Sequence, residues 1–232
     1  MERAVAGVDG CRGGWVVVTV PPGDTAAARV DVVHSLVQLA HDLLSGRLAA
    51  AAIDIPIGLP AGGSRPADVA ARRHLGARRN SVFPAPARAV LGARTYPEAG
   101  AISRGICAKG LSKQLFNILD KIREVDDLQS PVLQRHLVEM CPELSFTMLT
   151  GAPMQHPKRT PEGRAERLRA LGTAFAPEGV CRHAGAPPAG AKPDDVIDAF
   201  VGAWTARRYL AGAHLRLGGE LDETGLRMEM IA

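Results

Sequence analysis

The chain has 232 residues, of which 46% are hydrophobic and 22% are charged. This composition excludes a disordered tail protein, a collagen-like repeat and a disulfide-stapled miniprotein. No apolar run reaches the roughly 20 residues that span a bilayer, and residues 1–9 lack the basic start and apolar stretch of a secretory signal. We therefore expect a cytoplasmic protein with no membrane partner. The four cysteines form no C-x-x-C pair, which argues against a zinc ribbon or a redox dithiol.

The net charge of +4 is unevenly distributed along the chain. Residues 60–113 carry 10 basic and 2 acidic side chains, whereas the segments before and after them each carry a net charge of −2. Because Arg and Lys contacts to phosphate supply most non-specific nucleic-acid affinity, this segment predicts a surface for a polyanion. A genomic preference for Arg codons would explain the excess of Arg over Lys, but not the local shortage of acids.

The first 60 residues predict a β-rich start. Two apolar runs are separated by Asp-Gly and Gly-Gly, which favours a hairpin. The predicted order is three strands, a helix and a fourth strand, at residues 5–8, 15–20, 29–33, 36–44 and 48–55. The fourth strand is almost fully apolar, as is typical of a central strand covered on both faces in an α/β protein.

The rest of the chain predicts helices around that sheet, in a single domain over residues 1–232. Residues 60–130 form a basic insertion of loops and short helical pieces. Further on, the patterns predict an amphipathic helix at 109–127, a strand at 137–140, a helix from 142, a helix at 157–171, a loop at 176–192, a helix at 193–210 and a hairpin at 214–230.

Two carboxylates follow apolar strands. Asp54 interrupts the fourth predicted strand, where an ionised carboxylate costs several kcal/mol unless it is paired or bound to a metal. Asp54 could instead lie just past the strand and accept backbone N–H bonds, and Asp9-Gly10 is also a common hairpin turn. If the two strands are neighbours, both carboxylates converge at the edge where open α/β sheets place their sites.

The last predicted helix and the one starting at Pro142 add three acids. Asp195 and Asp198 lie about 60° apart on one helix face. Asp195 could be an ordinary first-turn acid, and so could Glu143, whereas Asp198 lies beyond the first turn beside the apolar stripe. Acids on two strand ends and a late helix make an all-oxygen ligand set that suits Mg²⁺ or Mn²⁺. Two such ions ~4 Å apart can promote phosphodiester hydrolysis.

Seven blocks of the sequence resemble, in order, a prokaryotic family described as predicted nucleases of ribonuclease H-like fold, the domain of unknown function 429 family. The blocks are VDGCRGGW (8–15), IDIPIGLP (53–60), SVFPAP (81–86), KGLSKQLFNILDKIREVD (109–126), CPELSF (141–146), KRTPEGRAERL (158–168) and PDDVIDAFVGAWTARR (193–208). The resemblance implies a ribonuclease H-like mixed sheet flanked by helices.

The resemblance also implies roles for the acids. The implied metal ligands are Asp9, Asp54, Asp195 and Asp198, and Glu143 is implied as an additional catalytic acid or a group behind the ligands. Ribonuclease H proper carries a metal-binding acid on its first helix. In this sequence Asp42 lies on the first predicted helix, but the residues around it do not match the ribonuclease H motif.

Five cations are candidates for phosphate contacts in the substrate: Arg12, Lys109, Lys113, Lys158 and Arg159. Each could equally be a solvated surface charge. Ser81, Phe83 and Pro84 could shape a pocket, although Phe83 could also be plain core. With only 4% aromatic residues, the sequence gives little support to broad base stacking.

Our leading hypothesis is a metal-dependent phosphodiester hydrolase that acts on nucleic acid or a nucleotide. One alternative is an actin-like ATPase, because residues 9–13 mimic a first-strand phosphate turn. The other is a non-catalytic nucleic-acid-binding or scaffolding protein on the same fold. The oligomeric state stays open, with a homodimer as one option.

Overall fold

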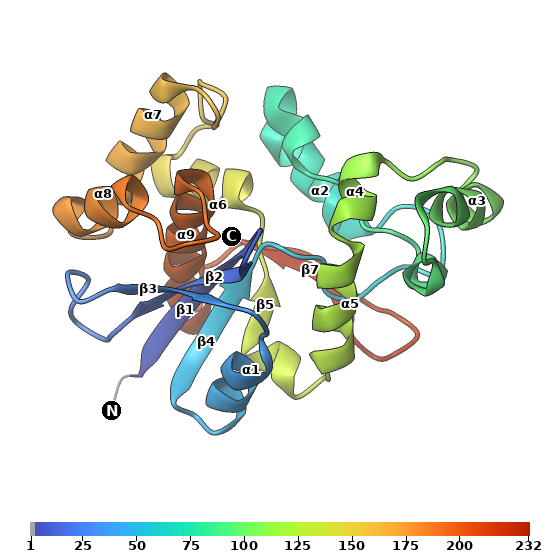
Figure 1. Cartoon of the computed structure of the whole chain (residues 1–232), viewed down its shortest axis with the longest axis horizontal. Helices are drawn as coiled ribbons and strands as arrows, with labels where there is room; N and C mark the ends of the chain where they lie inside the picture. The colour runs from blue at the N-terminus through green and yellow to red at the C-terminus, as the bar shows by residue number, and fades with distance from the viewer. Residues whose placement is uncertain (1–2) are drawn as a thin grey trace.

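The computed structural model describes residues 3–232, which include a five-stranded mixed sheet (Figure 1). The strand order is β3-β2-β1-β4-β5, in which β1–β3 are antiparallel neighbours and β4 and β5 run parallel to β1. The strands are β1 (Ala4–Cys11), β2 (Gly14–Val20), β3 (Arg29–Val33), β4 (Leu48–Ile53) and β5 (Leu137–Glu139). The prediction of a mixed α/β sheet flanked by helices is confirmed, as is the order of its first five elements.

The sheet is covered on both faces, which explains why every residue of β4 is buried. On one face, α1 (Val37–Leu44) and α5 (Leu119–Leu128) pack against side chains such as Val8 and Ile53. On the other face, α9 (Pro193–Leu210) packs on alternate residues such as Val5 and Ala52. Because side chains alternate between the two faces, residues that continue this pattern at the ends of the strands also point toward α9.

Four α-helices lie between β4 and β5, within the predicted insertion: α2 (Pro66–Leu75), α3 (Tyr96–Cys107), α4 (Lys113–Asn117) and α5. The single helix predicted at 109–127 was wrong. Ser112 caps α4, and Ile118 leaves the helical conformation between α4 and α5. The break lets both helices bury their leucines in the core that covers the α1 face of the sheet.

The C-terminal part contains α6 (Pro142–Thr150), α7 (Pro161–Leu171), α8 (Pro177–Gly185), α9, and a hairpin of β6 (Arg216–Leu221) and β7 (Arg227–Ile231). Helix α8 corrects the predicted loop at 176–192, since Pro177 occupies a helix N-terminus and Val180 and Ala184 are buried under α9. Helix α7 starts four residues later than predicted because Thr160 caps it. None of the helices in residues 3–232 is both long and apolar enough to cross a membrane.

Candidate functional site

Asp9, which lies within β1, and Asp54, which directly follows β4, point to the same face of the sheet. Asp9 continues the alternation of Val5 on the α9 face, and Asp54 continues that of Ala52. The strands are parallel neighbours, and the Asp54 N–H donates to the Val8 carbonyl at 3.1 Å, just past the last paired residues. The sheet therefore brings both carboxylates to its carboxyl edge, as their positions in the sequence predict.

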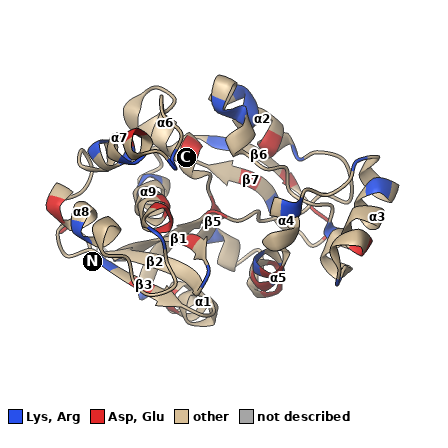
Figure 2. Ribbon diagram, turned by 45° about the horizontal axis from the view of Figure 1, so that its top comes forward, with Lys and Arg blue, Asp and Glu red and all other residues tan. Residues whose placement is uncertain are grey.

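Helix α9 adds two further acids above that edge. It packs closely on β1, and Figure 2 shows acidic segments of the two elements next to each other. Asp198 is only 1% exposed, whereas Asp195 is half-buried and accepts a hydrogen bond from the Lys192 N–H at 2.8 Å. Asp195 thus also caps its own helix, which was the alternative role that its first-turn position suggested.

The four acids, Asp9, Asp54, Asp195 and Asp198, act on one another and are here called the acid cluster. Burial raises the pKa of Asp9 well above its usual range, and repulsion from Asp198, Asp54 and then Asp195 raises it further. Burial also raises the pKa of Asp54 to about 7, with Asp198 adding to the shift. The pKa of Asp198 is raised by its burial. Burial and mutual repulsion therefore destabilise the ionised carboxylates, and a cation bound among them would stabilise their charged form.

Lys158 supplies the positive charge within this group. Its Nζ lies 2.6 Å from Asp198 Oδ2, and the attraction of Asp198, followed by that of Asp54 and Asp9, raises the pKa of the Lys158 ammonium. The side chain is still 45% exposed, so it can leave the cluster without unfolding its surroundings. The sequence assigned Lys158 to phosphate contacts and gave no sign of this pairing.

The loop that carries Lys158 is held in place by charged side chains. Glu166 on α7 accepts hydrogen bonds from the N–H groups of Gln155 and His156, at 2.7 and 3.0 Å. Arg167 donates to the His156 carbonyl, and Arg78 donates to the carbonyls of residues 154 and 155. The insertion and α7 together fix the base of this loop, which positions the lysine over the acids.

A buried ionic network lies behind the cluster, on the opposite face of the sheet. Glu139 ends β5, and burial raises its pKa to about 7 despite its partner Arg65. Arg65 is 1% exposed and donates to both oxygens of Glu139, at 2.6 and 2.8 Å, and to Asp68. It also donates to the carbonyls of Ile57 and Gly58, directly after Asp54. The network thus fixes the turn that follows Asp54.

Sequence reasoning missed both Glu139 and Arg65. Like Asp54, Glu139 is an acid beside apolar strand residues. Its strand has only three residues, which is too short a pattern to make the acid stand out. Arg65 stands in a Gly- and Pro-rich stretch that carries no periodic pattern.

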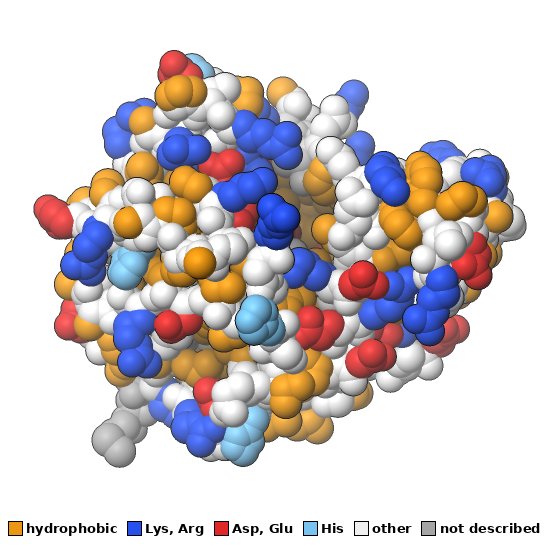
Figure 3. Space-filling model, in the orientation of Figure 1, with side chains coloured by type: hydrophobic (Ala, Val, Ile, Leu, Met, Phe, Trp, Pro, Cys, Tyr) orange, Lys and Arg blue, Asp and Glu red, His pale blue; other side chains and the backbone are white. Residues whose placement is uncertain are grey.

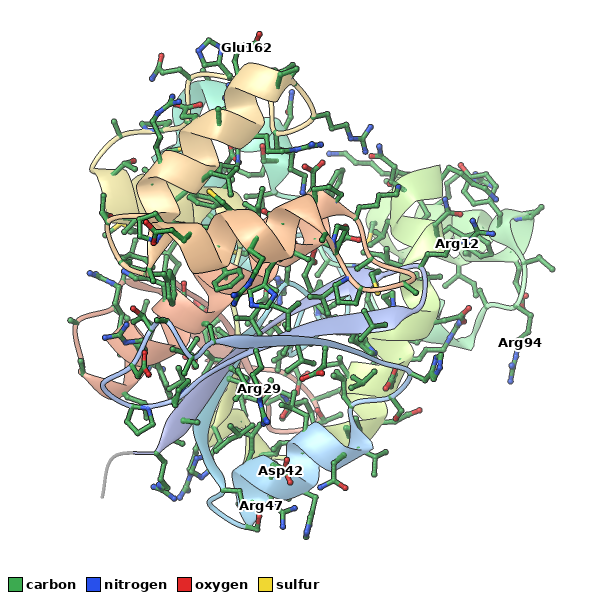
Figure 4. The ribbon with its side chains drawn as sticks, turned by 60° about the vertical axis from the view of Figure 1, so that its left-hand side comes forward. Arg12, Arg29, Asp42, Arg47, Arg94 and Glu162 are labelled. Atoms are coloured by element: carbon green, nitrogen blue, oxygen red, sulfur yellow. The ribbon has the colours of Figure 1, made fainter. Side chains whose placement is uncertain are left out.

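The other predicted site residues lie apart from the acid cluster. Glu143 forms an ion pair with Arg167 at 2.6 Å, so this carboxylate joins α6 to α7. Asp42, which the sequence did not assign to the site, lies on α1, across the sheet from α9, and pairs with Arg47 just after that helix (Figure 4). This pairing gives Asp42 a structural role, in line with its unmatched motif.

The predicted phosphate-contact cations are spread over several elements. Arg12 is exposed at the tip of the β1–β2 hairpin (Figure 4). Lys113 lies over the rings of Tyr96 and Phe116, at 4.7 and 4.8 Å. Lys109 and Arg159 are exposed. Only Lys158 touches the acid cluster.

The cluster has the donor chemistry of a magnesium or manganese site without the full geometry of one. Within residues 3–232, no three His, Cys, Asp or Glu side chains stand close enough together to hold a metal ion. Carboxylate oxygens are nevertheless the ligands that hard divalent cations prefer, and the mutual repulsion of the acids favours a cation among them. The residues fit such an ion by chemistry and charge.

Comparison with known proteins gives one match. The model of the family described as "Protein of unknown function (DUF429)" matches residues 7–223. Neither the curated proteins nor the solved structures give a match. The family match covers the sheet from Gly7 of β1 onward, the acid cluster and the Lys158 loop. The chain therefore belongs to the DUF429 family.

Proposed function

We propose that this protein is a metal-dependent phosphodiester hydrolase that acts on nucleic acid or a nucleotide. The observation that carries the proposal is the mutual repulsion of Asp9, Asp54 and Asp198, three acids on two strands and a helix whose pKa values are all raised. Perturbed carboxylates that converge at the carboxyl edge of a sheet mark a functional site more often than a structural one. The strand order, with β1 between antiparallel β2 and parallel β4, is also compatible with a ribonuclease H-like core.

In this proposal Asp9, Asp54 and Asp198 hold Mg²⁺ or Mn²⁺ and Asp195 assists, whereas Glu143 is held by Arg167. A bound ion would supply a low-pKa water and stabilise charge on the leaving oxygen. Lys158, which neutralises Asp198 at 2.6 Å, is then free to contact a phosphate oxygen once another cation satisfies that carboxylate.

The direct test is cleavage of labelled oligonucleotides in Mn²⁺ by the wild type and two variants. Asp9→Asn and Asp54→Asn should each abolish cleavage, because each removes a ligand charge while keeping the side-chain shape. Asp42→Asn is the matched control, since this aspartate pairs with Arg47 outside the cluster, and its rate should stay within about twofold of the wild type. Full activity in both cluster variants would overturn the assignment.

A second candidate is a nucleic-acid-binding protein with no catalysis. It is favoured by the Lys158–Asp198 ion pair, which balances the cluster in part without any metal. Calorimetric titration separates the two candidates. Binding of Mn²⁺ that is lost in Asp54→Asn supports the hydrolase, whereas nucleic-acid binding with no heat from Mg²⁺ or Mn²⁺ supports the second candidate.

A further inference from the structure

A basic hollow lies in the insertion, beside α2. The hollow has a volume of about 620 Å³. Its wall includes four cations, Arg72, Arg73, Arg79 and Lys109, and two apolar side chains, Val69 and Pro84. We call this feature the basic hollow.

The cations of the basic hollow have no acidic partners. Among residues 3–232, none of the four forms an ion pair, although Arg72 donates to the Val82 carbonyl at 2.9 Å. The wall contains one carboxylate, Asp68, whose oxygens accept hydrogen bonds from Arg65 and from the Ala85 N–H. Four cations around one concavity repel one another, so the hollow attracts a ligand with several negative charges.

The basic hollow is connected to the acid cluster by neighbouring contacts. Arg79 in its wall follows Arg78, which donates to the carbonyls of the loop that carries Lys158. Asp68 is linked through Arg65 to Glu139, whose charge acts on Asp54. Figure 3 shows the molecule hollowed between the core and the insertion, with Lys and Arg side chains along the border. The basic hollow and the acid cluster are therefore held by one connected set of contacts, through Arg78 and Arg65.

The shape and the apolar groups of the hollow favour an unpaired strand over a duplex. A duplex presents its phosphates on a convex surface, whereas a single strand can enter a concavity and turn its bases to the protein. Val69 and Pro84 give the hollow an apolar part. Phe83, next to Pro84, has a side chain that is 48% exposed, which leaves a ring face available for a base.

We propose that the basic hollow binds single-stranded nucleic acid, with phosphates on its four cations and a base stacked on Phe83. This inference deepens the proposed function, on which it rests, by naming the substrate class. It can be tested without catalysis, in EDTA, with a fluorescent single-stranded oligonucleotide and its blunt duplex as probes.

The main variant combines Arg73→Gln, Arg79→Gln and Lys109→Gln, which neutralises exposed side chains of the hollow. It should bind the single strand at least tenfold more weakly. The slope of log affinity against log salt should fall by about 2, because each lost phosphate contact on a single strand accounts for about 0.7. The control combines Arg29→Gln, Arg169→Gln and Arg182→Gln, which removes the same charge from exposed positions elsewhere and should bind within about twofold of the wild type.

Phe83→Ala is the second variant, and it leaves the charge unchanged. It should weaken binding of the single strand about fivefold or more while leaving duplex binding unchanged. Equal affinity and equal salt slope in the hollow and control triples would overturn the site. Equal losses for single strand and duplex in the hollow triple, with no effect of Phe83→Ala, would show that the hollow does not distinguish the two forms and would overturn the substrate class.

The proposed function fails separately from this inference. The double variant Asp9→Asn/Asp54→Asn should bind the single strand at least as tightly as the wild type, because it loses negative charge near the strand. A wild type that binds through the hollow but never cleaves in Mn²⁺ would contradict the hydrolase and leave the binding site standing.

Discussion

Gly7 on β1 and Gly202 on α9 lie against each other, and a methyl group built on Gly202 would stand 3.1 Å from the Gly7 Cα. A methyl group on Gly7 would overlap the backbone of Ala199 and Ala203. This contact sets the distance between helix and strand. Asp9 lies two residues after Gly7 on the same strand face, and Asp198 lies one turn before Gly202 on the same helix face. The glycine pair therefore determines how closely the two acids approach.

We expect Gly7→Ala to separate α9 from β1 and so to damage both the fold and the acid cluster. Overpacking a tight core contact costs typically 1–3 kcal/mol, and a contact with backbone gives little room to relax, so we expect about 3 kcal/mol in urea unfolding. Gly179→Ala on α8 is the control, because a methyl group there meets nothing within 4 Å. Wild-type stability in Gly7→Ala would mean that the close approach is not required.

The stability of the protein should fall as the pH rises from about 5 to 8. The pKa values of Asp54 and Glu139 are about 7 in the folded chain, above their values of roughly 4 when unfolded. The folded state therefore binds more protons over this range, and the free energy of unfolding decreases with pH. The stabilisation that each of these two carboxyl groups adds to the folded state is complete below about pH 4 and is lost as the pH rises through about 7.

Urea unfolding of the wild type and Asp54→Asn at several pH values measures this effect. The variant should gain stability relative to the wild type as the pH rises, by on the order of a few kcal/mol at pH 8. Mn²⁺ should stabilise the wild type more at pH 8 than at pH 5, because it binds the ionised acids. A constant difference between the two proteins across the range would contradict a raised pKa for Asp54.

The site residues that could be predicted from the sequence are charged residues at positions where the surrounding pattern predicts an apolar one. Asp54 stands at the end of an apolar run, and Asp198 lies beyond the first turn of its helix, so neither is easily explained by local structure. The family match covers both residues. The placement of the acids at one sheet edge follows from strand alternation and parallel pairing, which are both local rules.

The partners of the charged residues could not be predicted in the same way. Arg65 and Glu139 are 74 residues apart, and Lys158 and Asp198 are 40 apart. Such pairs depend on how the insertion and the loop before α7 pack against the sheet, for which no periodic pattern exists. Helix α8 was missed for a related reason, since its two buried residues join the core through packing against other helices, α7 and α9.

Lys158 should stabilise the metal-free protein and compete with divalent ions. Lys158→Gln leaves the Asp198 carboxylate unpaired and buried. Because the lysine is half exposed, we expect a loss of about 1–2 kcal/mol rather than the larger cost of a fully buried pair. Mn²⁺ should raise the melting temperature of Lys158→Gln more than that of the wild type, since the ion no longer displaces an ammonium.

Arg159→Gln is the control for this prediction, because the neighbouring side chain is exposed and forms no ion pair within residues 3–232. Its stability should stay within about 0.5 kcal/mol of the wild type. Identical melting shifts with Mn²⁺ in Lys158→Gln and the wild type would show that the ammonium and the ion do not share the cluster.

Arg65→Met should be the most destabilising of these changes. It removes the donor to Glu139 and Asp68 and leaves two carboxylates buried without their cation. Breaking a buried ion pair by removing one partner costs roughly 3–5 kcal/mol. The exposed Arg73 on the same helix is the control, and Arg73→Met should change the free energy of unfolding by about 0.5 kcal/mol or less.

The loss in Arg65→Met should itself depend on pH and on Glu139. Without the guanidinium, Glu139 is easier to bury when protonated, so the loss should be smaller at pH 5 than at pH 8. Adding Glu139→Gln should recover part of the stability, because the amide removes one unpaired charge. If the double variant were less stable than Arg65→Met at pH 8, Glu139 would be satisfied by other donors, and the network would not depend on its arginine.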